Sequence, residues 1–300
     1  MIDFNGRKTA VALGNFDGLH KGHFAVINKA VMKKHNGLLP CILTFDSHPQ
    51  KILKGSAPKK IMTRSLCEKE SEKLGCETVR LSFEEVRNMT PEEFFSKILI
   101  KQMNAEFISC GFNYRFGKNG AGTAETLRKL CEKAGIGFEC ADEVLCDGVV
   151  VSSTIIRQAV ENGEIEKANN MLGRYFAYDF EVVHGDRIGK KLLGFPTINQ
   201  LFPEWHVIPK NGVYASVTEV DGKLYPSMTN IGKRPTVNGD QLRSETCIIG
   251  FSGDLYGAHP EVKLIKMIRD EKKFPSLEAL SAQLKIDSEK AENVYNEVFR

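Results

Sequence analysis

Long apolar segments are missing from this chain of 300 residues. No run of roughly 18 apolar residues occurs. The opening MIDFNGRKTAVALG also has no extended apolar stretch of the kind that a signal peptide carries. We therefore expect a protein that neither spans a membrane nor is exported.

Paired cysteines are missing as well. The sequence has eight cysteines, and no two of them form a C-x-x-C pair, so the usual ligand spacing of a zinc site is absent. Several of the cysteines lie in apolar or helical contexts, as reduced buried thiols do. The expected compartment is the cytoplasm.

An excess of charge of either sign is also absent. Forty-one basic residues against 38 acidic residues give a formal net charge of +3. The Lys-Lys pairs are scattered along the chain and form no stripe, so nucleic acid is not an expected partner. Any phosphate site has to be built locally, because there is no global positive field.

The residues that are present indicate a folded protein of two domains. An apolar share of 42% and a charged share of 26% are ordinary for a globular chain, and 300 residues exceed a typical single domain. The first half alternates short apolar runs, such as 9–14 and 39–45, with segments of helical period. A helix is predicted to open at Thr90, which precedes a proline and two glutamates. This alternation predicts an α/β domain with a Rossmann-like parallel sheet covered by helices.

The pattern changes in the second half. From Tyr178 onward, short β-like runs are separated by turns that contain glycine or proline, and Asp221-Gly222 predicts a hairpin turn. Helical spacing returns after Ser276 and again after Asp287. This order predicts an antiparallel β-barrel with C-terminal helices. We expect domains at 1–170 and 171–300.

A glycine-rich turn with two histidines lies in the first half. Residues 14–23 read GNFDGLHKGH, between a predicted strand and a predicted helix. Glycines let the backbone approach a phosphate closely, and a helix N-terminus presents free N–H groups. His20 and His23, three residues apart, should share a face and donate hydrogen bonds to negative charge that grows on a phosphate. The alternative is an ordinary turn with two exposed histidines.

A second polar segment opens another predicted helix. Residues 152–157 read SSTIIR. The hydroxyls can cap the helix and meet a phosphate, and Arg157 offers a planar cationic fork. Taken by itself, the segment is explained more simply as a helix cap followed by a surface arginine.

Two further segments, TFDSHP (44–49) and GFNYRFG (111–117), end predicted strands. In open parallel sheets, ligands bind outside such strand ends. Asp46 or Asn113 would be placed there to orient a polar group. The aromatic side chains that are candidates to line a site for a ring are Phe45, Phe112, Tyr114 and Phe116.

The second half contains GKKLLGFPTIN at residues 189–199. Thr197 and Asn199 alternate on an extended segment, so their side chains should face one side, and their oxygens are hard ligands that suit Mg²⁺. The segment is not a Walker A loop, which has a different spacing and leads into a helix. The residues alone favour a tight turn with two solvated polar side chains.

These segments, in this order, resemble the bacterial bifunctional riboflavin kinase/FAD synthetase family, whose adenylyltransferase half belongs to the HxGH nucleotidyltransferases. GFPTIN is similar to the family's GFPTAN signature, and NIGKRPT (230–236), SETCIIGF (244–251) and MIRDEKKF (267–274) follow in the family's order. The resemblance extends over 9–298. It implies an enzyme that uses ATP and Mg²⁺ to phosphorylate riboflavin to FMN in the C-terminal domain. It also implies that the N-terminal domain adenylylates FMN to FAD and releases pyrophosphate.

The resemblance also implies site residues, with riboflavin, FMN and ATP as the small-molecule partners. In the adenylyltransferase site, the catalytic residues would be His20, His23 and Arg157. ATP would be contacted there by Gly14, Asn15, Phe16, Asp17, His20, His23, Ser153, Thr154 and Arg157, and the flavin by Asp46, His48 and Asn113. In the kinase site, ATP would be contacted by Gly189, Lys190, Gly194, Thr197 and Asn199, the last two also holding Mg²⁺. The flavin would be contacted there by Glu245, Arg269 and Phe274.

Glu245 falls at the family's catalytic glutamate. A carboxylate that accepts the proton of the riboflavin 5′-hydroxyl makes chemical sense, because a neutral alcohol is a poor nucleophile. Two nearby positions depart from the family pattern: Cys247 replaces a common histidine, and Gly250 replaces a common aspartate. Because side chains alternate along a strand, Cys247 should share the face of Glu245.

Two alternatives stay open. In the first, only the adenylyltransferase is active and the barrel is a scaffold that holds flavin. In the second, the protein is a regulatory or storage module that binds flavin without turnover. The presence of His20, His23, Arg157 and Glu245, which only chemistry requires, argues against the second alternative.

Overall fold

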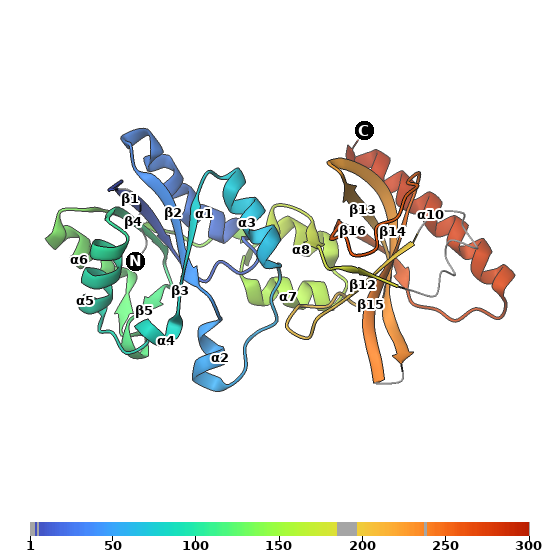
Figure 1. The fold of residues 1–300 in the computed structure, drawn as a ribbon, viewed down its shortest axis with the longest axis horizontal. Coiled ribbons are helices and arrows are strands. Elements are labelled where there is room, and N and C mark those ends of the chain that lie inside the picture. The colour runs from blue at the N-terminus through green and yellow to red at the C-terminus, as the bar shows by residue number, and fades with distance from the viewer. Residues whose placement is uncertain (1–3, 5, 185–196, 237–238, 300) are drawn as a thin grey trace. The chain divides into compact units, whose positions relative to one another are not determined.

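The computed structural model describes residues 4, 6–184, 197–236 and 239–299 (Figure 1). The chain forms two compact units, each with its own main sheet. The N-terminal unit consists of Met1–Pro58 and Arg64–Ser152, and the C-terminal unit consists of Lys59–Thr63 and Ser153–Arg300.

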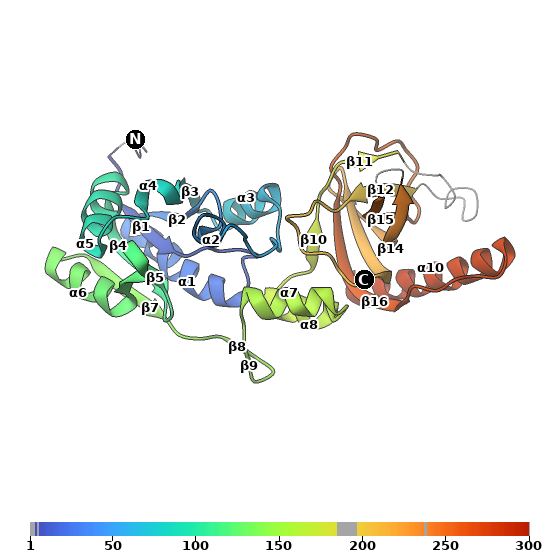
Figure 2. The same cartoon turned by 90° about the horizontal axis from the view of Figure 1, so that it is seen from below.

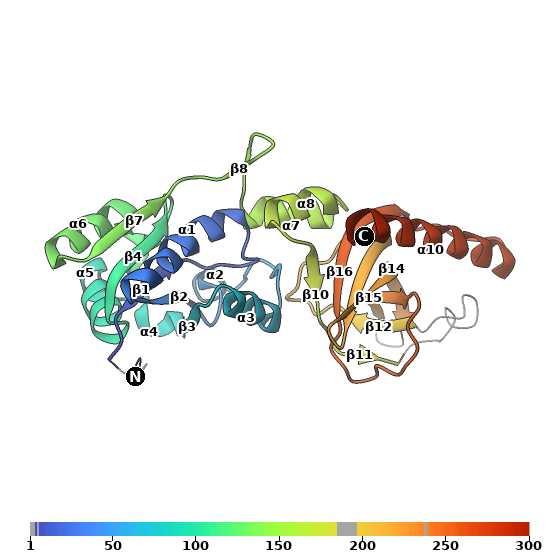
Figure 3. The same cartoon turned by 90° about the horizontal axis from the view of Figure 1, so that it is seen from above.

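A five-stranded parallel sheet forms the centre of the N-terminal unit, in the order β3-β2-β1-β4-β7 (Figures 1 and 3). The middle strand β1 (Thr9–Leu13) is buried at all five residues, as expected for a strand covered on both faces. It pairs with β2 (Leu39–Phe45) on one side and with β4 (Ala105–Gly111) on the other. The outer strands are β3 (Glu77–Leu81) and β7 (Gly137–Ala141). The predicted α/β fold is confirmed.

Helices cover both faces of this sheet. One face packs against η2 (Phe94–Gln102) and α6 (Ala124–Ala134), whose apolar residues join Val11 and the other residues of that strand face in one core cluster. The opposite face carries α1 (Lys21–Val31). There the hydroxyl of Ser109 on β4 donates a hydrogen bond to a carbonyl of α1 at 3.0 Å.

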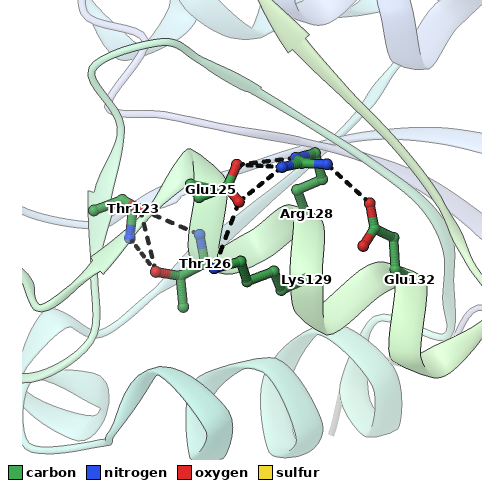
Figure 4. Close-up of polar contacts among 6 residues, drawn as sticks. All are labelled: Thr123, Glu125, Thr126, Arg128, Lys129 and Glu132. Carbon is green, nitrogen blue, oxygen red and sulfur yellow. Dashed lines mark hydrogen bonds and ion pairs between the residues drawn. The ribbon is translucent and has the colours of Figure 1, made fainter.

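The helix α6 begins where the sequence supplies a cap (Figure 4). Thr123 Oγ1 accepts the N–H of Thr126, and Thr126 Oγ1 accepts the N–H of Thr123, both at 3.2 Å. On its exposed side, Arg128 pairs with Glu125 at 2.7 Å. Such surface pairs contribute only a few tenths of a kcal/mol, so the burial of Leu127 on the sheet side matters more for this helix.

The other elements of the N-terminal unit are short. They are η1 (Met32–Asn36), α2 (Pro49–Lys54), α3 (Arg64–Lys73), α4 (Phe83–Val86), α5 (Pro91–Glu93), η3 (Lys118–Gly120), the pair β5 (Arg115–Phe116) and β6 (Gly122–Thr123), and the hairpin of β8 (Leu145–Cys146) and β9 (Val149–Val150). As predicted, Thr90 opens a helix: it is the N-cap residue of α5 and forms a capping box with Glu93.

All eight cysteines are free thiols. Burial raises the pKa of the thiols of Cys41, Cys110 and Cys131 to about 12. These side chains therefore stay protonated and pack as small apolar groups. Among the described residues, no helix combines the length and the apolar character that crossing a membrane requires.

The C-terminal unit is built on a seven-stranded antiparallel sheet that curls into a half-barrel, in the order β10-β16-β13-β14-β15-β12-β11 (Figure 2). The predicted β-barrel architecture is confirmed, and so is the hairpin turn at Asp221-Gly222, where both φ angles are positive. The strands are β10 (Phe176–Tyr178), β11 (Val182–Val183), β12 (Thr197–Leu201), β13 (Gly212–Val220), β14 (Lys223–Thr236), β15 (Gly239–Ile248) and β16 (Glu261–Asp270).

The C-terminal helical patterns form one helix rather than two. α10 (Leu277–Phe299) runs along β13, β14 and β16 (Figures 2 and 3). Asp287, which separates the two apolar patterns in the sequence, is fully buried within it. The carboxylate of Asp287 has a partner on the sheet, described below.

Two helices, α7 (Ser153–Glu161) and α8 (Ile165–Leu172), open the C-terminal unit and pack on each other. The compact unit thus begins before residue 171. Where the two functional domains divide stays a prediction.

A short segment from the first half of the chain, Lys59–Thr63, belongs to the C-terminal unit. The N–H of Lys60 donates to the carbonyl of Trp205 at 2.7 Å, and the N–H of Val207 donates to the carbonyl of Lys60 at 2.9 Å. Ile61 is only 2% exposed. The 59–63 segment is therefore an integral part of this unit, although the first half of the chain supplies it.

His206, which forms a β-bridge with Lys60, is buried among aromatic rings. Its ring meets that of Phe180 edge-on with centroids 5.1 Å apart, and its Nδ1 lies 2.7 Å from the carbonyl oxygen of Val207. Burial lowers the pKa of His206 to about 4. The imidazole is neutral in the folded protein, and Nδ1–H donates to that carbonyl.

This buried histidine predicts a loss of stability in mild acid. His206 takes up a proton near pH 6.5 in the unfolded chain but only near pH 4 in the folded protein. Its contribution to the free energy of unfolding is therefore fully present above pH 6.5 and is lost as the pH falls toward 4. We expect the free energy of unfolding to fall by about 2 kcal/mol between pH 7 and pH 5 through this group. Urea unfolding of wild type and His206→Phe should show that loss in wild type only. An exposed-site control, His35→Gln, should behave as wild type, and an equal loss in all three proteins would contradict the assignment.

Candidate active sites

The turn after β1 is shaped by close backbone contacts. Phe16 and Leu19 have positive φ angles of 49° and 39°, an uncommon conformation for residues other than glycine. A Cβ at Gly14 would lie 2.9 Å from the buried ring of Phe16, so a larger residue there would have to displace that ring. The turn is therefore folded back on itself before α1 begins at Lys21.

His20 and His23 lie side by side at the start of α1. His20 is the N-cap residue, and its Nδ1 accepts the backbone N–H of His23 at 3.3 Å. The two rings are stacked, with centroids 3.5 Å apart and planes 18° apart, and the edge of Phe16 meets the His23 ring at 5.3 Å. Because Nδ1 of His20 is an acceptor, its neutral ring carries the proton on Nε2. This pair of imidazoles stands at a helix N-terminus, which favours anions.

The ends of three strands meet beside this turn. Leu13, at the end of β1, is in register with Leu43 on β2 and Cys110 on β4. Strand order reverses at β1, and ligands of doubly wound sheets bind at such a switch point, outside the carboxyl ends. Asp46 and Asn113 each follow these register positions by three residues, and both are exposed. The fold thus brings the predicted flavin contacts to the same sheet edge as the histidine pair.

The other polar residues at this edge have local hydrogen bonds. His48 caps α2, with Nδ1 accepting the N–H of Gln50 at 3.2 Å. Thr44 Oγ1 donates to the carbonyl of Asn15 at 3.1 Å, which ties the turn after β1 to the end of β2. Asp17 belongs to the same turn. The ATP roles of Asn15 and Asp17 stay predictions.

The aromatic side chains of this region are mostly core. Phe116 is 5% exposed, and the ring of Tyr114 stacks on it at 6.0 Å. Phe45 packs edge-on against Phe83 at 5.3 Å. Of the four candidates for an aromatic-ring site, Phe112 is the one with an exposed side chain, at 52%.

The 152–157 segment crosses the boundary between the two units. Ser153, Thr154 and Arg157 lie on α7 in the C-terminal unit. Nε of Arg157 donates to the carbonyl of Lys59 at 2.5 Å. This arginine therefore anchors the 59–63 segment, and its predicted role at ATP stays a prediction.

Three of the predicted kinase residues, Asn199, Glu245 and Arg269, lie in one row that crosses five strands. Glu245 on β15 is in register with Asn199 on β12 and with Asn230 on β14. Asn230 is in register with Val213 on β13, which in turn is in register with Arg269 on β16. Register partners share a face of the sheet, so these five side chains emerge on the same side. Three of them were predicted as site residues from widely separated parts of the sequence.

Asn199 carries a polar atom that is buried without a hydrogen bond. The residue is 4% exposed, and within the described part of the chain its Oδ1 has no hydrogen-bond partner. Thr197, two residues earlier, is half-buried on the same face. An orphaned amide oxygen beside a hydroxyl fits a hard cation such as Mg²⁺. Gly189, Lys190 and Gly194 lie outside the described residues.

Arg269 is tied to α10. Its Nε and Nη2 lie 2.9 and 2.8 Å from Oδ2 of the fully buried Asp287, and Gln283 donates to the other carboxylate oxygen at 2.9 Å. The guanidinium also lies 5.6 Å from the ring centre of Phe274. The sequence prediction did not include Asp287 as a partner, although a charged residue inside an apolar helical pattern is a signal for a buried ion pair.

Cys247 lies on the same face as Glu245, in register with Thr197 and Met228. It is 2% exposed in an apolar cluster with Val213 and Ala291, and burial raises the pKa of its thiol to about 12. The face of Glu245 is therefore partly covered by the apolar contact with α10. Gly250 has a φ of 75°, a conformation that glycine adopts without strain.

Two family models match the chain, one for each module. The FAD synthetase model matches residues 3–155, and the riboflavin kinase model matches residues 172–295. The chain is 34% identical over 294 residues to the bifunctional riboflavin kinase/FMN adenylyltransferase of Bacillus subtilis (strain 168), which covers 95% of this chain and 92% of the relative. The protein of the same description from Escherichia coli (strain K12) is 33% identical over 285 residues, or 92% and 90% of the two chains.

A similar solved structure supports the fold. A crystal structure described as a macrolide-efflux protein from Streptococcus pneumoniae superimposes with a TM-score of 0.85 and 32% sequence identity, over 96% of this chain and 95% of that one.

The parallel α/β unit and the half-barrel unit, each with its matching model, define a two-module transferase of flavin metabolism. The chain belongs to the bifunctional riboflavin kinase/FMN adenylyltransferase family. The prediction of both activities on one chain is confirmed at the level of the family, in preference to a non-enzymatic flavin-binding module.

Proposed function

We propose that the C-terminal unit phosphorylates riboflavin with ATP and that the N-terminal unit adenylylates the resulting FMN. In the first reaction, the 5′-hydroxyl oxygen of riboflavin attacks the γ-phosphorus of ATP and ADP leaves. In the second, a phosphate oxygen of FMN attacks the α-phosphorus of another ATP and pyrophosphate leaves. The proposal is carried by two groups of polar residues: the histidine pair in the region matched by the FAD synthetase model, and the row around Glu245 in the region matched by the riboflavin kinase model.

The stacked histidine pair supports adenylyl transfer. The attacking phosphate of FMN is already an anion, so no base is required, and catalysis consists of positioning and of stabilising the charge that grows on phosphate oxygens. His20 and His23 stand at the N-terminus of α1, whose free N–H groups add to the positive potential. We assign the imidazoles as hydrogen-bond donors to the α-phosphate in the transition state.

Glu245 supports phosphoryl transfer. It is second in the row, next to Asn199 on the side assigned to ATP, and Arg269, on the side assigned to the flavin, lies three strands away. We assign its carboxylate as the group that accepts the proton of the 5′-hydroxyl. Thr197 and Asn199 would hold Mg²⁺, which neutralises the charge of the ATP phosphates when bound.

The expected setting is the cytoplasm, and the expected small-molecule partners are riboflavin, FMN and ATP. The eight free thiols suit a reducing compartment. The scattered Lys-Lys pairs argue against nucleic acid as a partner.

A product assay tests the proposal. Wild-type protein incubated with riboflavin, ATP and Mg²⁺ should yield FMN first and then FAD, and chelation of the metal with EDTA should stop both steps. If supplied FMN becomes FAD while riboflavin yields neither product, the barrel is a scaffold and the kinase assignment fails. If neither substrate is converted, the whole proposal fails.

A further inference from the structure

Asn230 lies in the row of kinase residues but was not singled out by its sequence motif. It is the cross-strand neighbour of Glu245 on β14, one strand closer to Arg269. It is half-buried on the face that α10 covers. Its next neighbour in the row is Val213, an apolar residue of the α10 contact. The polar side chain of Asn230 thus lies between the carboxylate of Glu245 and the apolar contact of Val213 with α10, a position where a role in binding or in structure is expected.

A structural role within the sheet does not account for the amide of Asn230. The neighbouring residue Thr229 points to the opposite face, where its hydroxyl bonds to those of Ser216 and Thr246 at 2.8 Å each. That hydroxyl ladder belongs to the interior of the half-barrel and does not involve Asn230. Within the described residues, no hydrogen bond from the Asn230 side chain is present to fix it in the sheet.

Space beside the amide is kept by a glycine. Gly232, two residues along β14 on the same face, would place a Cβ 3.7 Å from Nδ2 of Asn230. The same Cβ would lie 2.6 Å from Oε1 of Glu271, whose carboxylate accepts a hydrogen bond from Asn211 at 3.4 Å. The surroundings of Asn230 away from the apolar cluster are thus polar.

The spacing of the row indicates which of its residues different parts of a bound substrate would contact. Neighbouring strands are about 4.8 Å apart, so Glu245 and Arg269 are separated by about 14 Å along the sheet. Riboflavin consists of an aromatic ring system and a ribityl chain that ends in the 5′-hydroxyl. With that hydroxyl at Glu245, a ribityl chain that extends toward the next strand, about 4.8 Å away, reaches Asn230.

We propose that Asn230 is a substrate-binding residue that recognises a hydroxyl of the ribityl chain. This inference rests on the proposed function, because it takes Glu245 as the residue at the 5′-hydroxyl. An amide offers both a donor and an acceptor, as does a sugar-alcohol hydroxyl, so the pair is chemically matched. Recognition of this kind selects flavins with a polyol chain over flavins with an apolar chain.

The test combines a variant with altered substrates. Asn230→Leu keeps the approximate volume but removes the amide, and we expect it to weaken riboflavin binding by about fivefold to tenfold, as for one lost hydrogen bond. Binding is measured by quenching of flavin fluorescence, without ATP. The same titration is repeated with 2′-, 3′- and 4′-deoxyriboflavin. For the analogue that lacks the contacted hydroxyl, wild type and Asn230→Leu should bind equally well.

Two comparisons separate this inference from its alternatives. Asn296→Ala, which removes a partly buried amide on α10, should leave riboflavin binding unchanged. The inference is overturned if Asn230→Leu binds riboflavin like wild type, or if it weakens all three analogues by the same factor as riboflavin. Failure of the wild-type chain to bind riboflavin would instead overturn the proposed kinase function, and this inference with it.

Discussion

Replacing His23 by alanine should reduce FAD formation by about 10²–10³-fold, because a hydrogen-bond donor to the transition state is lost. The stacked geometry makes this residue the better of the two histidines to change. His20 caps α1 through its Nδ1, so its loss would also disturb the helix, whereas His23 contributes only a backbone N–H to that cap. The measurement is the rate of FAD production from supplied FMN and ATP under saturating conditions.

Two controls are built into this experiment. FMN production from riboflavin by the same variant should keep the wild-type rate, because the kinase residues lie in the other unit. His35→Ala changes an exposed histidine outside the turn and should leave FAD formation intact. FAD synthesis at the wild-type rate in His23→Ala would show that the histidine pair is structural.

The second large effect is expected at Glu245. Glu245→Gln keeps the shape of the side chain but cannot accept a proton, so FMN formation should fall by about 10²–10⁴-fold. The turnover number should change far more than the Michaelis constant for riboflavin, since the amide still fills the position between Asn199 and Asn230. Adenylylation of supplied FMN should continue.

The matched control is Glu204→Gln, an exposed glutamate of the same unit, which should have no effect. Retention of FMN formation in Glu245→Gln would remove Glu245 from its assigned role. Loss of both reactions would mean that the variant is unfolded or that the modules depend on each other, and thermal unfolding distinguishes these two outcomes.

Local sequence signals predicted local structure well. The apolar run of 39–45 became β2, and the helix predicted to open at Thr90 is α5, whose capping box joins Thr90 and Glu93. The side-by-side placement of His20 and His23 followed from a spacing of three residues at a helix start. In each case the signal and the structure lie within a few residues of one another.

Long-range features were predicted only through the family resemblance, or not at all. The row from Asn199 to Arg269 depends on the register of four strand pairs, which no spacing along the chain specifies. The partnership of Arg269 and Asp287 joins a strand to a helix, and no spacing along the chain indicates it. The 59–63 segment, KKIMT, has neither a helical nor a strand period, so nothing local indicated that it completes the other unit.

That segment has a consequence for exchanging modules between relatives. A hybrid gene that joins the N-terminal half of one family member to the C-terminal half of another would import five foreign residues into the recipient's half-barrel unit. Ile61 would then have to fit a core that it did not evolve with, and the backbone bonds to Trp205 and Val207 would form between mismatched partners. A working hybrid should therefore take Lys59–Thr63 from the same parent as residues 153–300.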